Sequence, residues 1–221
     1  SIMFVRNKMT SNPFTISADQ TIPDAHEIMT QHGVKRLPVM KNGKLVGVVS
    51  REDIAQASPS KATSFSMGEI TYLLSKTKIS QIMNKNPITI SSDALLEEAA
   101  ILMRDNDVSF LPVVDNGKLV GIITESNIFD AFIDLLAFRE PGTRLTVEVS
   151  DKPGVMANLT GIIGEFGANI THVAVYRGTG GKSSIVLGIN SLNTAEMEKS
   201  IEAHGYKILY KLQNKYKANN I

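Results

Sequence analysis

The feature that most constrains this chain is an internal repeat. The segment from Val5 to Ile54 aligns without a gap with the segment 74 residues further on. Met9 falls on Met83, and the hexapeptide NGKLVG at 42–47 recurs unchanged at 116–121. Because self-similarity at a fixed period means that one structural unit is used twice, the first 138 residues are expected to fold as two copies of a unit.

Each copy contains the same succession of local signals. A β-prone dipeptide comes first (residues 15–16 and 89–90), and a helical pattern follows, in which apolar residues recur every three or four positions. The apolar face of that helix carries Ile22, Ala25, Ile28 and Met29 in the first copy, matched by Leu95/Leu96, Ala99, Leu102 and Met103 in the second. Gly33 is expected to end the first of these helices.

Two strands and a second helix complete the unit. The strands are expected at 37–40 and 45–49 in the first copy, and at 110–114 and 119–123 in the second. Asn-Gly joins them in both, and this dipeptide favours a hairpin because both central residues of a type I′ turn need positive φ. The unit is therefore strand–helix–strand–strand–helix. A hairpin alone cannot bury both of its faces, so the two copies should pack together as one body.

These recurring elements resemble a tandem pair of CBS domains, also called a Bateman module. The resemblance is carried by Met-Thr…Pro…Thr-Ile, Leu-Pro-Val, Asn-Gly-Lys-Leu-Val-Gly and Ser/Thr-x-x-Asp/Asn, in that order, twice. It divides the first part of the chain into a repeat at 3–58, a linker at 59–78 and a repeat at 79–138. Within the linker, Pro59 to Thr63 should break the chain, and Ser66 with Glu69 predicts a capping box at the start of an ordered helix.

The C-terminal third has a different pattern, which begins after a boundary at 140–143. A half-buried strand, an amphipathic helix ending at Gly167, a hairpin, a second helix and a last strand are expected over 143–212, with a tail at 213–221. This βαββαβ order resembles an ACT domain. The predicted fold class is thus α/β of the α+β kind: two tandem CBS repeats packed as one module, followed by a ferredoxin-like ACT domain. The combination resembles the bacterial acetoin-utilisation B family, for which it implies regulation.

Two strand-to-helix junctions are the main candidate sites: Ser50-x-x-Asp53 and Thr124-x-x-Asn127. Each is a helix N-terminal cap by its residue types alone. The same geometry also favours phosphate at the amide groups and ribose hydroxyls at the Asp or Asn side chain. In CBS pairs that resemble this one, the junction is the nucleotide cleft. Asn127 lacks the carboxylate, so the stronger site is expected at Asp53.

The resemblance also implies an adenine pocket beside these junctions. Its residues would be Thr15, Ile16, Lys35, Arg36, Leu37 and Pro38 in the first copy, and Thr89, Ile90, Ser109, Phe110, Leu111 and Pro112 in the second. The change of Lys35-Arg36 to Ser109-Phe110 is either variation on a strand surface or the mark of an asymmetric pair. In the second case one site is basic and holds Asp53, and the other offers Phe110 for stacking on a base.

The ACT resemblance implies an effector turn. An amino acid would bind at Asp151, Pro153, Gly154, Val155, Asn169 and Ile170. The alternative is structural: Pro-Gly makes a turn, Asn169 tolerates an unusual backbone angle, and the domain only dimerises.

The sequence lacks the residues that several functions would require. Cysteine is absent, the four histidines have no zinc spacing, and no serine stands in a nucleophile elbow, so neither metal nor catalysis is expected. The run 178–183 lacks the first P-loop glycine and precedes a strand, so it is expected to be a hairpin loop. The formal net charge of +1 does not call for nucleic acid, and the longest apolar stretches fall far short of the ~20 residues of a membrane span.

Two functions remain open. One is a cytoplasmic, ligand-responsive regulator that binds AMP, ADP, ATP, NAD or S-adenosylmethionine and acts on an unidentified protein. The other is a dimeric adaptor whose ligand sites are vestigial. In both, a homodimer is expected, because the helix after the second hairpin carries Ile128, Phe129, Phe132, Leu135 and Leu136, and an apolar patch of this kind marks an interface.

Overall fold

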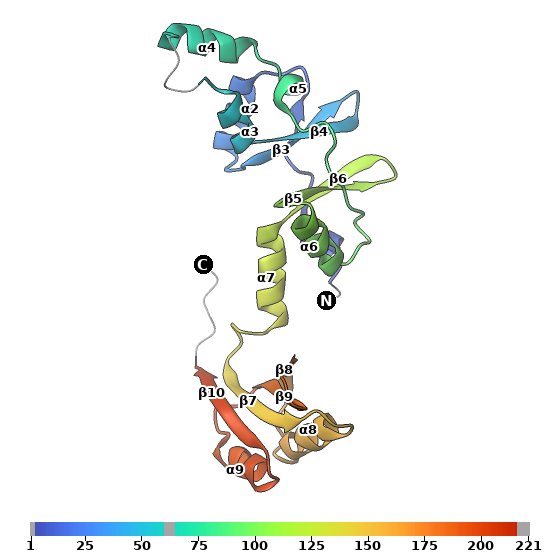
Figure 1. Cartoon of the computed structure of the whole chain (residues 1–221), viewed down its shortest axis with the longest axis vertical. Coiled ribbons are helices and arrows are strands. Elements are labelled where there is room, and N and C mark those ends of the chain that lie inside the picture. Colours follow the sequence, from blue (N-terminus) through green and yellow to red (C-terminus); the bar gives the residue numbers. More distant parts are fainter. Residues whose placement is uncertain (1–2, 60–64, 216–221) are drawn as a thin grey trace. The chain divides into compact units, whose positions relative to one another are not determined.

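The computed structural model describes residues 3–59 and 65–215. The chain divides into two compact units, with the boundary between Phe129 and Asp130 (Figure 1). The first unit contains both repeats except for residues 130–138 of the predicted second repeat, which fall in the second unit with the C-terminal third. Mixed α+β structure is found in both, as the sequence predicts.

The N-terminal unit follows the predicted order of elements with small additions. The first repeat contains α1 (Val5–Lys8), β1 (Thr10–Ser11), β2 (Ile16–Ser17), α2 (Ile22–Gln31), β3 (Arg36–Lys41), β4 (Lys44–Ser50) and α3 (Arg51–Ala57). The linker forms α4 (Met67–Lys76). The second repeat contains α5 (Ile79–Ile82), α6 (Leu96–Asp105), β5 (Phe110–Asp115) and β6 (Lys118–Thr124), and α7 (Glu125–Leu135) follows.

Both predicted hairpins are confirmed. Asn42 and Gly43 have φ of 51° and 73°, and Asn116 and Gly117 have φ of 50° and 75°. These are the positive angles that a type I′ turn requires of both central residues. Gly33 also behaves as expected: it follows the C-cap of α2 with φ of 65°, a conformation that a side chain would disfavour.

The two repeats exchange their leading segments. The strand β1 of the first repeat pairs antiparallel with β6 of the second, Thr10 opposite Ile122. In return, Asn84 bridges to Val48 of β4, with N–H to carbonyl distances of 3.0 and 2.9 Å in the two directions. The β1-β6-β5 sheet therefore contains a strand from the first repeat, and the β2-β3-β4 sheet, whose strands all belong to the first repeat, is extended at β4 by the bridge to Asn84 of the second.

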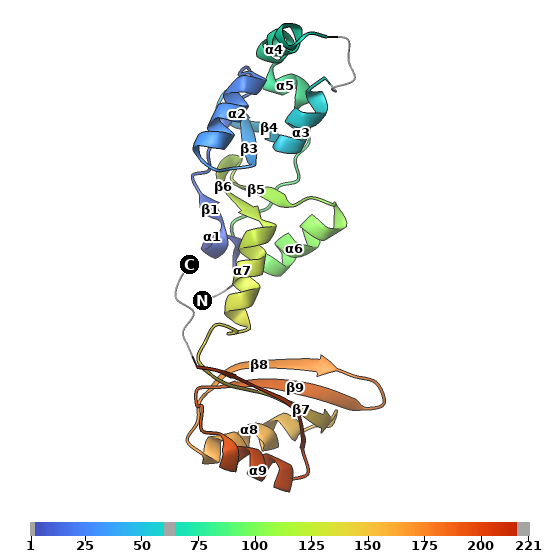
Figure 2. The same ribbon diagram turned by 90° about the vertical axis from the view of Figure 1, so that its left-hand side faces the viewer.

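The predicted helical and strand faces make the core of this unit. The strands β4 and β6, one from each hairpin, contact each other at the centre of the unit (Figures 1 and 2). Side chains that are fully buried or nearly so include Ile16, Met29, Leu37, Val39 and Val49 in the first repeat, and Ala99, Met103, Leu111, Val113 and Ile123 in the second.

The linker helix α4 has the predicted capping box. The Glu69 carboxylate accepts from the Ser66 N–H at 2.8 Å, and the Glu69 N–H donates to the Ser66 hydroxyl at 3.3 Å. The predicted chain break from Pro59 to Thr63 lies largely outside the described residues. The helix packs against α2 and leaves the side chains of Met67 and Tyr72 77% and 63% exposed.

The C-terminal unit has the predicted βαββαβ order. Its elements are β7 (Gly142–Ser150), α8 (Val155–Glu165), β8 (Ile170–Arg177), β9 (Lys182–Ile189), α9 (Ala195–Ala203) and β10 (Lys207–Asn214). The sheet is antiparallel in the order β10-β7-β9-β8, and both helices cover one of its faces (Figure 2). Leu145, Leu159 and Leu187 are fully buried between sheet and helices. The strand β10 runs to Asn214, two residues beyond the predicted end of the domain at 212.

One prediction about exposed apolar residues needs correction. Of the five side chains expected on the surface of α7, Ile128 is buried, and Phe132 and Leu136 are half-buried. Phe129 and Leu135 are 63% and 53% exposed. A helix of this periodicity turns one apolar side inward, so the apolar sequence run could not all face solvent.

The exchange of segments predicts a strict requirement for glycine at position 47. A Cβ atom on Gly47 would lie 2.7 Å from the carbonyl oxygen of Asn84 and 2.7 Å from the sulfur of Met83. We expect Gly47→Ala to lower the free energy of unfolding by about 1–3 kcal/mol, because over-packing displaces the exchanged segment. Urea unfolding followed by circular dichroism measures this loss.

The matched control is Gly68→Ala in α4, where a Cβ atom would meet nothing closer than 4.0 Å. This variant should be as stable as the parent chain or slightly more stable, because alanine favours a helix. If Gly47→Ala unfolds at the same urea concentration as Gly68→Ala, the close approach of the exchanged segment is not a structural requirement.

Candidate functional site

Two clefts lie between the repeats of the N-terminal unit. The first, here the Asp53 cleft, has a volume of about 400 Å³ and is lined by Arg36, Val48, Ser50, Asp53, Asn84, Asn86, Pro87, Ile88, Asn106, Asp107, Val108, Ser109, Phe110 and Pro112. The second, here the Lys35 cleft, has a volume of about 320 Å³ and is lined by Thr10, Pro13, Phe14, Gly33, Val34, Lys35, Arg36, Ile122, Thr124 and Ser126. Both volumes are typical of small-molecule sites.

The clefts are images of one another under the sequence repeat. The Asp53 cleft joins Ser50 and Asp53 of the first repeat to Pro87 and Phe110 of the second. The Lys35 cleft reverses this, joining Thr124 of the second repeat to Pro13, Phe14 and Lys35 of the first. The exchanged segments cause the crossing, because each leading segment lies on the sheet of the other repeat.

This crossing corrects the predicted grouping of residues. The sequence placed Lys35 and Arg36 with Asp53, and gave Phe110 to the other site. In the structure, Lys35 lines the cleft that contains Thr124, whereas Phe110 lines the cleft that contains Asp53. Arg36 lines both clefts. Order along the chain could not reveal that each cleft draws on both repeats.

Both strand-to-helix junctions form capping boxes. In the first, the Ser50 N–H donates to Asp53 Oδ2 at 2.7 Å, and the Asp53 N–H donates to the Ser50 hydroxyl at 3.1 Å. In the second, the Thr124 N–H donates to Asn127 Oδ1 at 2.9 Å, and the Asn127 N–H donates to Thr124 Oγ1 at 3.3 Å. An amide oxygen therefore performs the same capping as a carboxylate, with one charge less.

A second acidic group, Glu52, lies beside Asp53 at the first junction. A hydrogen bond from its own backbone N–H, then the Ser50 hydroxyl and the charges of Arg36 and Lys35, lower the pKa of Glu52. The carboxylate of Glu52 is thus ionised at neutral pH and offsets part of the positive charge of these two side chains.

Each cleft contains one aromatic ring. The guanidinium carbon of Arg36 lies 5.3 Å from the centroid of the Phe110 ring in the Asp53 cleft. In the Lys35 cleft, Phe14 stacks on His32 with 3.7 Å between ring centroids and an interplanar angle of 14°. Phe14 is 48% exposed and lines the Lys35 cleft.

Part of the predicted adenine pocket lies elsewhere. The side chains of Ile16, Leu37, Ile90 and Leu111 are buried in the core. Thr15 and Pro38 line neither cleft, and Thr89 lines a separate depression. The predicted residues that do line the clefts are Lys35, Arg36, Ser50, Asp53, Ser109, Phe110, Pro112 and Thr124, whereas Asn127 contributes through its bond to Thr124.

Sequence reasoning missed several lining residues. Pro13 and Phe14 in one cleft, and Pro87 and Ile88 in the other, precede the predicted β-prone dipeptides by only one or two residues. A signal for them existed, because the dipeptide Asn-Pro recurs at 12–13 and 86–87 in the aligned copies. No local pattern indicated Asp107, which has φ of 52° and lies where the first repeat has Gly33.

The predicted effector site of the C-terminal unit is not assembled in one place. Gly154 adopts φ of 86° and begins α8, as a Pro-Gly turn implies. Val155 lines a depression with Glu148, Lys182 and Tyr206, and that depression includes neither Asn169 nor Ile170.

The backbone of Asn169 also differs from the prediction. It does not have positive φ; that conformation falls on Gly167, at 65°. The Asn169 N–H instead donates to the side chain of Asn190 at 2.8 Å. Since Gly167 already makes the sharp turn after α8, Asn169 serves to join two loops.

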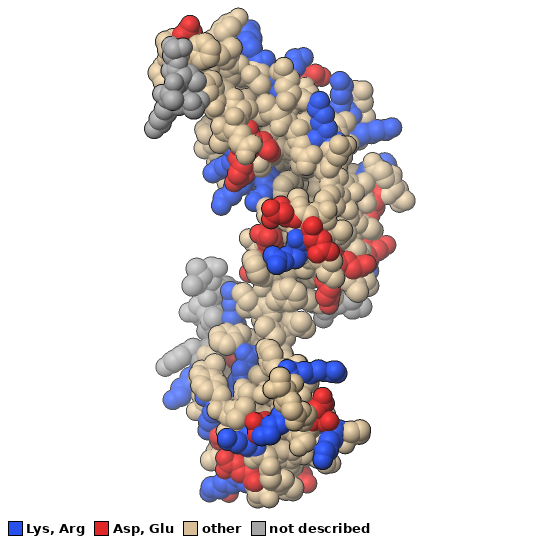
Figure 3. Space-filling model, viewed as in Figure 1, with Lys and Arg blue, Asp and Glu red and all other residues tan. Residues whose placement is uncertain are grey.

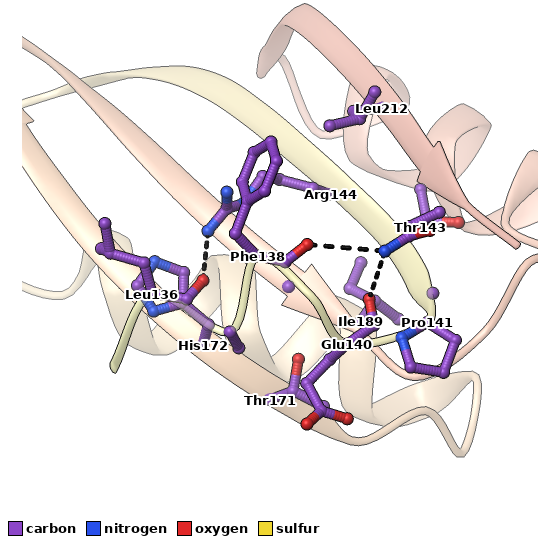
Figure 4. A pocket seen from close by; sticks show the side chains of 14 residues that line it. Leu136, Phe138, Glu140, Pro141, Thr143, Arg144, Thr171, His172, Ile189 and Leu212 are labelled. Carbon is purple, nitrogen blue, oxygen red and sulfur yellow. Dashed lines mark hydrogen bonds between the residues drawn. The ribbon is translucent and has the colours of Figure 1, made fainter. Parts of the chain in front are cut away.

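A small pocket lies on the other face of the C-terminal sheet (Figure 4). Arg144 donates to the carbonyl of Leu136 and lies 5.2 Å from the Phe138 ring centroid. Burial and the neighbouring Arg144 charge lower the pKa of His172, which the carbonyl of Leu135 partly opposes. The pocket volume of about 30 Å³ is near the room that one water needs, so it is too small for an effector.

Two further observations bear on function. The parts of the chain that the structure describes contain no group of side chains able to hold a metal ion. Across those same residues, none of the helices combines the length and the apolar character needed to span a bilayer. Basic and acidic side chains are interspersed on the face shown in Figure 3.

Two repeats that exchange strands and enclose two clefts are the arrangement expected of a CBS pair, and comparison with known proteins identifies the same family. Residues 5–60 and 79–134 match the CBS domain, and residues 141–210 match the TTHA0829-like ACT domain. The chain therefore belongs to the CBS domain family, with an ACT domain after the CBS pair.

The curated relatives include a CBS domain-containing protein that is matched over most of its length and a larger enzyme of which only a part is matched. A CBS domain-containing protein of Dictyostelium discoideum is 35% identical over 136 residues, which are 61% of this chain and 94% of the relative. A homoserine O-acetyltransferase of Methanococcus vannielii is 35% identical over 56% of this chain, but only 24% of the enzyme is covered.

Solved structures match the CBS pair at 30% identity. An acetoin utilization protein, AcuB, from Vibrio cholerae matches with a TM-score of 0.52 over 63% of this chain and 97% of its own. The CBS domain pair of protein MJ0100, in complex with 5-methylthioadenosine and S-adenosyl-L-methionine, gives 0.50 over 60% and 97%. CBSX2 in complex with AMP gives 0.50 over 59% and 96%.

The capping boxes predict different effects of two substitutions at position 53. Asp53→Ala removes the acceptor for the Ser50 N–H, and we expect it to lower the free energy of unfolding by about 1 kcal/mol. Asp53→Asn should change stability little, because Asn127 makes the same bonds in the second repeat. Thermal unfolding of the three proteins measures the difference. Equal losses in both variants would show that the charge of Asp53, and not its capping bonds, stabilises the junction.

Proposed function

We propose that this protein is a non-catalytic regulator that binds adenine nucleosides or nucleotides in the two clefts of its CBS pair. The observation that carries the proposal is the composition of each cleft. One repeat supplies a hydroxyl with a carboxylate or carboxamide, and the other supplies proline and an aromatic ring. Flat apolar surface opposite polar acceptors suits a ligand with a base at one end and a sugar at the other.

The polar side of the Asp53 cleft suits a ribose. Both bonds that join Ser50 to the Asp53 carboxylate end on Oδ2. A carboxylate has two oxygens with acceptor capacity beyond these bonds. Asp53 can therefore keep its helix cap and accept from ribose hydroxyls at the same time, so capping and ligand binding do not compete.

The aromatic rings suit a purine. Phe14 and Phe110 each line one cleft, and aromatic faces stack on flat heterocycles in offset arrangements. The similar CBS pairs whose structures contain AMP, 5-methylthioadenosine or S-adenosyl-L-methionine support an adenine ligand. The shared adenosine moiety is what the two clefts of this chain would recognise.

The proposed regulated partner is another protein, and the ACT domain would transmit or integrate the signal. An amino-acid effector at Asp151–Val155 stays a separate proposal, which the scattered positions of these residues and Asn169 do not support. The alternative function, a dimeric adaptor with vestigial clefts, is favoured by one observation: the exposed rings of Phe129 and Phe138, 63% and 57% exposed.

Ligand binding predicts a gain in stability. A nucleoside or nucleotide at 100 times its Kd should raise the free energy of unfolding by about 2.7 kcal/mol. Differential scanning calorimetry with AMP, ATP, NAD and S-adenosylmethionine should show the shift, and titration calorimetry the heat. The proposal fails if none of these compounds shifts the unfolding temperature or releases heat.

The matched variants for this experiment are Asp53→Ala and Asn127→Ala, each of which removes one capping side chain. Loss of the charge-assisted bond to ribose in Asp53→Ala should weaken binding in the Asp53 cleft by ~1.5–3 kcal/mol. Asn127→Ala should weaken binding less, because its amide makes no charge-assisted bond. Equal losses at the two positions would contradict the choice of Asp53 as the stronger ribose ligand.

The exposed apolar residues predict a symmetric homodimer. Apolar patches of this kind normally mark an interface, and two-fold pairing is the commonest way to cover one. Light scattering at micromolar concentration should report about twice the chain mass of 24.0 kDa. Phe129→Ser should shift the protein toward the monomer, with Phe14→Ser as the control on a different surface. A monomeric parent chain would exclude the dimer.

A further inference from the structure

The two clefts differ in charge at equivalent positions of the repeat. Lys35 of the first copy corresponds to Ser109 of the second, and Gly33 corresponds to Asp107. Because the clefts are crossed, Lys35 lines one cleft and Asp107 the other. Asp53, which is acidic, corresponds to the neutral Asn127 beside the Lys35 cleft. Every one of these exchanges makes the Lys35 cleft more positive and the Asp53 cleft more negative.

The resulting linings have opposite character. Lys35 and Arg36 line the Lys35 cleft, and its described lining contains no carboxylate. Two carboxylates, Asp53 and Asp107, line the Asp53 cleft and face a single cation there, Arg36. The volumes of the clefts are similar, so charge and not size distinguishes the ligands that they accept.

Arg36 belongs to both clefts. It lies at the start of β3, where the repeat places Phe110 in the second copy, and the two side chains stack across the centre of the unit. Glu52 lies close enough to Arg36 and Lys35 for its charge to interact with both. One guanidinium thus lines both clefts, and a phosphate in either cleft can interact with it.

We propose that the clefts take two classes of adenine ligand: the Lys35 cleft takes a phosphorylated nucleoside, and the Asp53 cleft takes a nucleoside without a phosphate. This assignment rests on the proposed function. A phosphate in the Lys35 cleft gains charge-assisted bonds from Lys35 and Arg36. A phosphate in the Asp53 cleft is repelled by Asp53 and Asp107, whereas an uncharged ribose is not.

The shared Arg36 also couples the two clefts. A phosphate that holds Arg36 in the Lys35 cleft removes positive charge from the Asp53 cleft, which disfavours a second phosphate there. By thermodynamic reciprocity, an anion forced into the Asp53 cleft weakens phosphate binding in the Lys35 cleft by the same factor. A nucleoside without a phosphate does not compete for Arg36, so both classes can be bound together.

Titration calorimetry of the full chain with AMP and with adenosine tests the assignment. We expect AMP to bind one cleft per chain, and Lys35→Gln to weaken it about tenfold or more through the loss of one charge-assisted bond. Adenosine binding should change less than about twofold in that variant. Asp107→Asn removes the charge and keeps a residue that tolerates positive φ, and it should add a second AMP site.

Arg36→Gln tests the sharing. In the parent chain, this substitution should weaken the binding of AMP to the Lys35 cleft. In the Asp107→Asn background, it should weaken the binding of AMP to both clefts. Lys35→Gln should affect only one cleft in either background. Thermal unfolding of each variant without ligand confirms that the fold is kept, since Lys35 is exposed and Asp107 lies in a loop.

The outcomes separate the inference from the proposed function. If neither AMP nor adenosine binds the parent chain, the nucleotide-sensing function fails and the assignment fails with it. If AMP binds but Lys35→Gln lowers AMP and adenosine affinity equally, or if AMP fills both clefts of the parent chain with one affinity, nucleotide binding stands. In that case the division by charge is overturned.

Discussion

The exchange of leading segments between the two repeats is the contact on which the N-terminal unit depends. The edge strand of each hairpin pairs with chain from the other repeat: β6 pairs with β1, and β4 is bridged by Asn84. Backbone hydrogen bonds of this kind need close approach, which Gly47 and Gly121 allow by having no Cβ atom. The same exchange carries Pro13 and Pro87 across to the opposite repeat and so creates both clefts.

Because both clefts arise from the exchange of segments, they are lined by equivalent positions of the two repeats. They differ wherever the two repeats have different residues at these positions. The capping boxes of Ser50 and Thr124 are nearly identical in their hydrogen bonds, so the backbone of both junctions is the same. The clefts differ in their side chains, and several of these differences change the charge, such as Lys35 against Ser109. A duplicated scaffold with unequal side chains can hold two ligands in one geometry and still tell them apart.

The C-terminal unit is built differently from the CBS pair. Its core is formed by one sheet face and two helices, with Leu145 and Leu187 fully buried. Among the hollows of its described surface are a small pocket of about 30 Å³ beside Arg144 and one of about 290 Å³ beside Val155. The pair of clefts related by the sequence repeat lies in the CBS pair.

The sequence by itself determined the elements and their order. Apolar periodicity located the helices, Asn42-Gly43 and Asn116-Gly117 determined the hairpins through their positive φ, and residue types determined the caps at Ser50 and Thr124. Only the tertiary structure decided which residues share a cleft. Lys35 is fifteen residues from Ser50, yet it lies with Thr124 of the other repeat. Local sequence patterns depend on residues that are neighbours along the chain. Strand exchange joins distant segments through backbone hydrogen bonds, which most residue types allow. No residue type in the sequence therefore predicted the exchange.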